Sequence, residues 1–303
     1  MSHIPPPQGP AGQPPSSPPT LPAALPSRVS PPPPHLLSSS LGPPAHQPSP
    51  PAGPPEFVSA PSSRLTVVTN AYDHQRATWG LGDMFTSLGI YFFGSLGLIL
   101  LIFAVSTRDD FLQGPLLLVG VVGPHALLLT HLFWVSRRKG ISFADDFRFR
   151  FQWSDARLGF GLFFGALIAA GMVAVLITQI VGDAPTASAV ELAQELGDGG
   201  LTIWLWLFAI LGAAFVPVVE ELVYRGLFWS ALEKRGMRPW TILVVTSAVF
   251  AIIHLEPIRT AVLFVVGMAI GIGRLVTGRV GASIATHVFI NTMAMTATLV
   301  QLA

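Results

Sequence analysis

A series of long apolar segments between Met84 and Ala303 most constrains what this chain can fold into. A helix that crosses the hydrocarbon core of a bilayer needs about 20 predominantly apolar residues, because each residue advances the helix by about 1.5 Å. Five segments are long enough and contain no Asp, Glu, Lys or Arg: Met84–Thr107, Gly114–Ser136, Leu158–Gly182, Leu201–Val219 and Val280–Ala303.

Two further apolar segments are shorter. Trp240–Leu255 has 16 residues and Thr260–Gly273 has 14. The second covers only about 21 Å as a helix. Either Arg259 and Arg274 at its ends extend their side chains outward to the membrane surface, or the segment enters the membrane and is shielded by its neighbours. The sequence therefore predicts an all-α, polytopic transmembrane helix bundle with seven spans, give or take one.

The first 64 residues have the opposite composition. They hold 22 of the 28 prolines and only three charged residues, Arg28, Glu56 and Arg64. Such a segment cannot bury enough apolar surface to offset the entropy lost on ordering, and its proline runs favour extended conformations. We therefore predict three parts: a disordered proline-rich tail (1–64), N-terminal transmembrane helices (84–182) and a C-terminal transmembrane core (201–303).

Charged residues in the loops predict the orientation, because short cytoplasmic loops are rich in Lys and Arg. The loop after the second span is strongly basic, whereas Asp183–Gly200 contains four acidic residues and no Lys or Arg. Seven crossings from a cytoplasmic N-terminus place every basic cluster inside. These clusters are Arg137, Arg138, Lys139, Arg148, Arg150 and Arg157, then Lys234, Arg235 and Arg238, then Arg274 and Arg279.

Charge and cysteine content also bear on which classes of function are open to this chain. A formal net charge of +1 gives no reason to expect a nucleic-acid partner. The chain has no cysteine, which excludes a cysteine nucleophile and thiolate metal ligands. The lipid bilayer is the one partner that composition requires.

Ionisable side chains in apolar spans are costly, and here they fall into three short motifs. The first, Glu220-Glu221-Leu-Val-Tyr-Arg225, follows an apolar run. On a helix Glu221 and Arg225 are four residues apart and can form an ion pair. Glu220 is rotated by about 100° from Glu221, so its carboxylate is presented to a different surface.

The other two motifs are also i, i+4 pairs. Phe250 precedes His254, and His287 precedes Asn291 inside an apolar segment. Counted from the nearest basic flank at about 1.5 Å per residue, Glu220 and His254 lie about 21 and 24 Å deep. On the same count His287 and Asn291 lie about 12 and 18 Å deep. Three helices could therefore bring a carboxylate, two imidazoles and an amide to nearly one level.

Two more histidines, His125 and His131, lie in the second span. An isolated histidine in a membrane helix commonly makes a helix–helix hydrogen bond. We interpret both as structural and place neither in the candidate site.

The ordered set E-E-x-x-x-R, F-x-x-x-H and H-x-x-x-N resembles the type II CAAX prenyl endopeptidases and their prokaryotic relatives, the CAAX proteases and bacteriocin-processing enzymes. The resemblance covers roughly Trp204 to Thr298. It implies an intramembrane glutamate-dependent endopeptidase in a bacterial cell membrane, acting on a membrane-associated protein or peptide. It does not identify that substrate or the oligomeric state.

Peptide hydrolysis requires an activated water and hydrogen-bond donors for the tetrahedral oxyanion. We assign Glu220 as the general base, with His254 holding and polarising the water. His287 and Asn291 are assigned to the oxyanion, and these roles match those that the resemblance implies. We expect Glu221 and Arg225 to support the site from behind, and Phe250 to shape the cavity.

Other functions remain open at this stage. No cofactor is expected, but one Glu and two His are also a zinc ligand set, so a divalent metal is the alternative within the enzyme class. A non-catalytic scaffold or bacteriocin-immunity-type protein could keep the same fold. A transporter is a third possibility, because intramembrane carboxylates and histidines can relay protons.

Overall fold

The computed structural model describes residues 78–105, 110–182, 191 and 201–303. The predicted tail 1–64 lies outside the described residues, as does nearly all of the predicted external loop 183–200. All regular secondary structure in the described residues is helical. The predicted all-α class is therefore confirmed.

Six helical stretches in the described residues are long and apolar enough to cross a membrane. The helix α9 is apolar but shorter, with 15 residues. The count agrees with the predicted seven spans within the margin of one. The long stretches are α1 (Leu81–Val105), α2 (Asp110–Lys139), α4 (Trp153–Val181), Ile203–Glu233, α10 (Thr260–Thr277) with the short turn η3 (Pro257–Arg259) before it, and α11 (Gly281–Leu302); α9 spans Pro239–Ile253.

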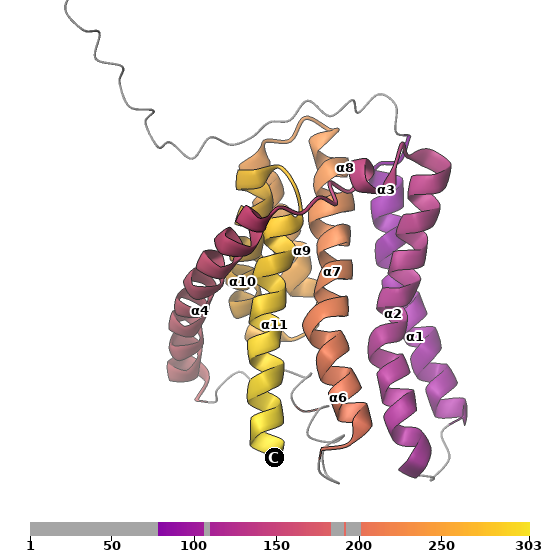
Figure 1. Ribbon diagram of the computed structural model, residues 1–303, viewed down its shortest axis with the longest axis vertical. Helices are drawn as coiled ribbons and strands as arrows, with labels where there is room; N and C mark the ends of the chain where they lie inside the picture. The colour runs from indigo at the N-terminus through magenta and orange to yellow at the C-terminus, as the bar shows by residue number, and fades with distance from the viewer. Residues whose placement is uncertain (1–77, 106–109, 183–190, 192–200) are drawn as a thin grey trace, which may run out of the picture. The chain divides into compact units, whose positions relative to one another are not determined.

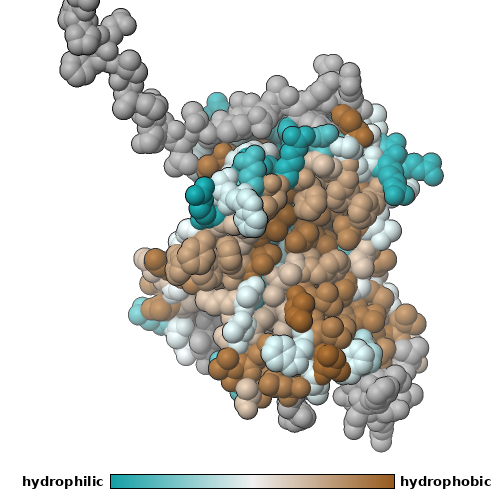
Figure 2. All heavy atoms as spheres, viewed as in Figure 1, coloured by the Kyte–Doolittle hydropathy of each residue, from teal (hydrophilic) through white to brown (hydrophobic). Residues whose placement is uncertain are grey.

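The stretch Ile203–Glu233 lies between two groups of helices (Figure 1). It contacts α11 on one side and α2 on the other, while α1 packs against α2. The helices α10 and α11 both pack against α4, and α10 packs against α9. Hydrophilic residues gather at the end of the helices where the short helix α3 (Phe143–Asp146) lies, and hydrophobic residues cover the middle (Figure 2).

The fourth span is longer than predicted. The sequence places its end at Val219, but the helix continues to Glu233 as α6 (Ile203–Ile210), η1 (Leu211–Phe215), α7 (Val216–Glu221), η2 (Leu222–Phe228) and α8 (Trp229–Glu233). A hydropathy criterion ends the span at the first carboxylates, whereas here the charged motif is buried inside the bundle. The segments η1 and η2 are π-helical, a geometry frequently found at functional sites.

Of the two alternatives for this short segment, shielding by neighbouring helices is the one that the structure shows at Arg274. The helix α10 continues past it to Thr277, and Arg274 is only 3% exposed. Its guanidinium donates from Nε to the carbonyl of Arg225 at 3.1 Å and also donates to the carbonyl of Gly278. Arg274 therefore joins α10 to the π segment η2.

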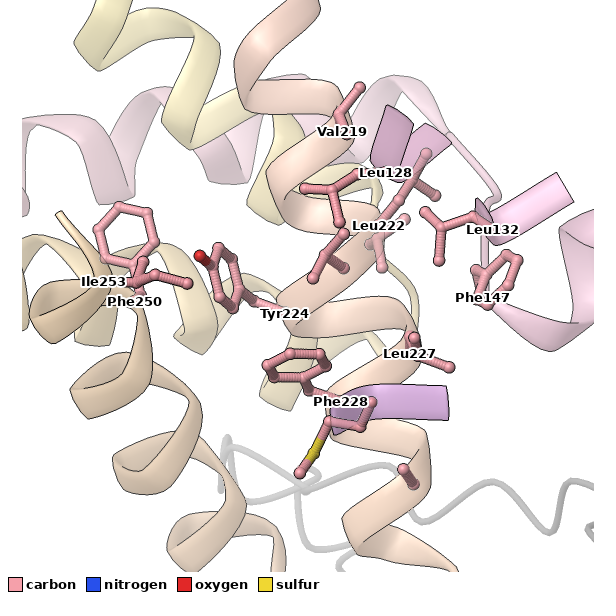
Figure 3. Close-up of a cluster of buried hydrophobic side chains, with 14 of the residues drawn as sticks. Leu128, Leu132, Phe147, Val219, Leu222, Tyr224, Leu227, Phe228, Phe250 and Ile253 are labelled. Carbon is pink, nitrogen blue, oxygen red and sulfur yellow. The ribbon is translucent and has the colours of Figure 1, made fainter. Parts of the chain in front are cut away.

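The main hydrophobic core surrounds the second half of the long helical stretch (Figure 3). Leu222 and Leu227 lie on the side of the α2 residues Leu128 and Leu132, whereas the ring of Tyr224 meets that of Phe250 on α9 edge to face at 5.5 Å. Burial of these aromatic and aliphatic side chains fixes the rotation of α7 and η2, and with it the direction of the motif that begins at Glu220.

Small residues allow the closest helix crossings. A Cβ on Gly267 would lie 3.3 Å from the Cα of Ser247, so this glycine brings α10 against α9. At Gly161 and Gly165 on α4, by contrast, a Cβ would meet no described atom within 4 Å. The α10 glycine therefore serves helix packing within the described bundle, whereas the two α4 glycines face no described neighbour.

We predict that Gly159→Ala destabilises the bundle. Its Cβ would lie 2.6 Å from the Cβ of Ala285 and 2.9 Å from the amide of Thr286, where α4 crosses α11. Overpacking of this kind typically costs about 1–3 kcal/mol. Thermal melts in detergent should show a lower midpoint for Gly159→Ala and no loss for Gly161→Ala, the matched change on the open face. Equal midpoints would contradict the crossing.

Candidate active site

The centre of the candidate site is Glu220, near the end of α7. Its side chain is 12% exposed and lies between two imidazoles. Oε1 is 3.4 Å from Nε2 of His125 on α2, and Oε2 is 3.7 Å from Nε2 of His287 on α11. Three helices thus converge on one carboxylate inside the bundle.

The neighbouring carboxylate, Glu221, is fully buried and makes a different set of contacts. Its Oε1 accepts from Nη1 of Arg225 at 3.2 Å and from Nδ1 of His287 at 2.9 Å. Arg225 in turn donates from Nη2 to the carbonyl of Gly267 on α10 at 2.6 Å. The predicted pairing of Glu221 with Arg225 is present, and it joins α7, α10 and α11.

The histidine His287 lies between the two acidic residues. Its Nδ1 contacts Glu221 and its Nε2 faces Glu220. A carboxylate accepts hydrogen bonds, so the proton on Nδ1 is held by Glu221 and the other ring nitrogen is directed at the candidate base.

The fourth predicted residue, Asn291, is one helical turn further along α11. Its Nδ2 donates to the carbonyl of Gly212 in η1 at 3.0 Å, rather than to Glu220. In η1 the amide of Val216 bonds to the carbonyl of Leu211, so the next amide in that register would come from residue 217. That residue is Pro217, which has no N–H. The carbonyl of Gly212 is therefore left for the side chain of Asn291.

The remaining predicted histidine, His254, caps the C-terminal end of α9 and is half-buried. Its Nδ1 is 2.6 Å from the carbonyl of Phe250, so Nδ1 carries the proton and Nε2 of the neutral ring is an acceptor. The ring of Phe250 lies 4.7 Å from that of His254 and 5.6 Å from that of His287. Phe250 thus separates the two imidazoles and lines the same region.

The residue that the sequence analysis missed is His125. Its Nδ1 donates to the carbonyl of Val121 at 2.9 Å, and its ring packs edge to face on Tyr91 at 5.8 Å. These contacts direct Nε2 at Glu220. His131, grouped with it in the sequence, instead stacks on Trp134. Both are single histidines in an apolar helix, so the sequence contains no signal that separates them.

The part of the chain that holds the predicted site residues is similar to a known protein family. Residues 202–293 match the family model described as type II CAAX prenyl endopeptidase Rce1-like. No curated protein and no solved structure matches the chain significantly. The matched region includes every predicted site residue and the long stretch that contains Glu220.

The fold and the match together indicate an integral membrane protein whose C-terminal region is similar to a protease family. More particularly, residues 202–293 are similar to the Rce1-like type II CAAX prenyl endopeptidases, the family that the motifs predicted. The helices α1, α2 and α4 lie outside the matched residues, and so does His125.

We predict that Glu221→Gln destabilises the protein. It leaves Arg225, which is fully buried, without its anionic partner, and breaking a buried ion pair typically costs about 3–5 kcal/mol. The matched control is Asp145→Asn, which removes the anion from an exposed pair with Arg150 and should cost less than about 1 kcal/mol. The midpoint of thermal unfolding in detergent measures both. A Glu221→Gln melt no lower than that of Asp145→Asn would contradict the role of this pair.

Proposed function

We propose that this protein is an intramembrane endopeptidase in which Glu220 activates a water for attack on a peptide bond of a membrane-associated substrate. The observation that carries the proposal is the convergence of His125 and His287 on Glu220, which itself lies within the region that matches a protease family. A carboxylate in a mostly dry site accepts a proton from water more readily than a fully solvated one.

In this proposal the two oxygens of Glu220 have different roles. Oε1 is engaged by His125, which leaves Oε2 to take the proton of the attacking water. Nε2 of His254, which is an acceptor in the neutral ring, can hold the second hydrogen of that water. The proton stored on Glu220 then passes to the leaving amine as the tetrahedral intermediate collapses, so the carboxylate is regenerated.

The oxyanion requires hydrogen-bond donors. For Nε2 of His287 to donate, the ring must be the imidazolium, with Nδ1–H held by Glu221. The amide of Asn291 has two N–H groups, and one is used by the carbonyl of Gly212. The second N–H is the one that we assign to the substrate oxygen.

A divalent metal is the alternative mechanism. Zinc takes three or four ligands from His, Cys and carboxylate side chains. Among the residues that the structure describes, no group of three such side chains is arranged to hold a metal ion. We propose the mechanism that uses the carboxylate and water alone, and a chelator distinguishes it from the metal alternative.

We predict that Glu220→Gln lowers the rate of peptide cleavage by at least about 10²-fold, because the amide cannot accept the proton of water. Asn291→Ala should lower it by about 10²–10³-fold if the amide stabilises the oxyanion. The assay is cleavage of a membrane peptide by the purified full chain, with folding checked by size-exclusion profile and thermal melt. A chelator should leave the wild-type rate unchanged.

Two outcomes would count against this mechanism. Wild-type rates in a well-folded Glu220→Gln variant would remove the protease assignment and leave a non-catalytic scaffold. Loss of activity with the chelator and recovery with added zinc would replace the metal-free mechanism with a metal-dependent one.

We predict that His125 positions the base. His125→Ala should lower kcat/KM about tenfold, the size expected for a lost hydrogen bond to a charged group, and His125→Gln should recover part of this because its amide can donate. With its Nδ1–H on the carbonyl of Val121, His125 donates from Nε2 to Glu220 only as the imidazolium, so both variants remove a positive charge beside the base and the acid limb of the pH profile of kcat/KM should move. His131→Gln is the matched control on the same helix. A pH profile unchanged in His125→Ala, with only the melt lowered, would reduce His125 to a structural role.

A further inference from the structure

A second polar site lies at the basic end of the bundle, apart from Glu220. A cleft of about 410 Å³ opens between the segment that joins α3 to α4 and the loop that joins α10 to α11. In Figure 1 the first segment crosses the end of the helices from α3 to α4. The cleft is lined by three arginines and by only one acidic side chain: Arg148, Arg150 and Arg279, with Asp145.

The framework of this cleft is fixed by buried contacts. Arg279 donates from Nε and Nη2 to the carboxylate of Asp155 at 2.9 and 2.6 Å, and Asp155 is completely buried. The same carboxylate accepts from the backbone of Gln152 at the start of α4. The amide of Val280 donates to the carbonyl of Arg148 at 3.1 Å. The segment that joins α3 to α4 and the loop that joins α10 to α11 are thus connected by hydrogen bonds before any ligand binds.

The charge that faces the cleft is positive. Asp145 pairs with Arg150 at 2.5 Å, but this pair is exposed, with 68% of the arginine side chain accessible. The hydrogen bond from Ser142, followed by the pair with Arg150, holds the pKa of Asp145 below its ordinary value. Three of the residues that line the cleft carry guanidinium groups and one carries a carboxylate, and guanidinium groups match phosphate oxygens in geometry.

Exposed aromatic side chains place this cleft at the membrane surface. Phe149, Phe151 and Trp153 alternate with the arginines of the connecting segment and are 44%, 56% and 84% exposed. Aromatic rings of this kind lie at the headgroup level of a bilayer, where basic pockets between helices meet anionic lipid. Figure 2 shows the hydrophilic band at this end next to the hydrophobic middle of the bundle.

We propose that the cleft formed by Arg148, Arg150 and Arg279 binds a phosphate anion, with an anionic phospholipid headgroup as its source. The lipid phosphate displaces the carboxylate of Asp145 from Arg150 and takes donors from the other two guanidinium groups. The acyl chains lie beside the exposed aromatic residues. This site is independent of the proposed peptidase chemistry.

The test uses the purified full chain in detergent, titrated with short-chain phosphatidylglycerol, short-chain phosphatidylcholine or inorganic phosphate, and followed by thermal shift. We expect saturable binding of phosphatidylglycerol and a much weaker response to phosphatidylcholine. Arg150→Gln should weaken binding about fivefold, the factor that corresponds to one arginine near an anionic surface. Asp145→Asn should strengthen binding by a similar factor, because it removes the internal competitor.

The matched control is Arg138→Gln, which removes an exposed charge near the end of α2, outside the cleft. It should leave the affinity for phosphatidylglycerol unchanged. Equal losses in Arg138→Gln and Arg150→Gln would overturn the proposal, because they would show diffuse attraction to the basic end. Inorganic phosphate that competes at the same concentration as the lipid would overturn the lipid as the source and leave a site for free anions.

Discussion

The site depends on one buried ion pair, that of Glu221 and Arg225. Both side chains are completely buried, so their charges are stabilised only by each other and by the hydrogen bonds around them. Those bonds reach the carbonyl of Gly267 on α10 and Nδ1 of His287 on α11. A buried pair of this kind adds little net stability over an apolar core, but breaking it is costly. Its contribution is to fix how three helices meet and which ring nitrogen of His287 faces Glu220.

Two π segments, η1 and η2, lie on either side of α7, the helix that carries both carboxylates. Each segment supplies a backbone carbonyl to a side chain from another helix: Gly212 to Asn291, and Arg225 to Arg274. In a regular α-helix these carbonyls would be used within the helix itself. The irregular backbone is therefore tied to α10 and α11, and side chains that would otherwise be unpaired in a dry interior gain partners.

Much of the site could be predicted from the sequence because its members lie in short i, i+4 motifs on separate spans. The pairing of Glu221 with Arg225, and the shared level of Glu220 and His287, follow from helical geometry alone. His125 could not be found in this way, because the rotation of α2 that turns it toward Glu220, and turns His131 away, is set by tertiary packing. Hydropathy also gave the wrong end for the fourth span and could not decide the surroundings of Arg274, since it treats every charge as a boundary even when neighbouring helices enclose it.

Pro217 has no amide hydrogen, and this limits which residues can replace it. Any other residue there would add an amide that competes with Asn291 for the carbonyl of Gly212. We therefore expect substitutions at position 217 to disturb Asn291 through the backbone, in addition to any change in the packing of this buried position. The orientation of the Asn291 amide on α11 thus depends on the proline ring at position 217 of α7. We expect the two positions to vary together or not at all.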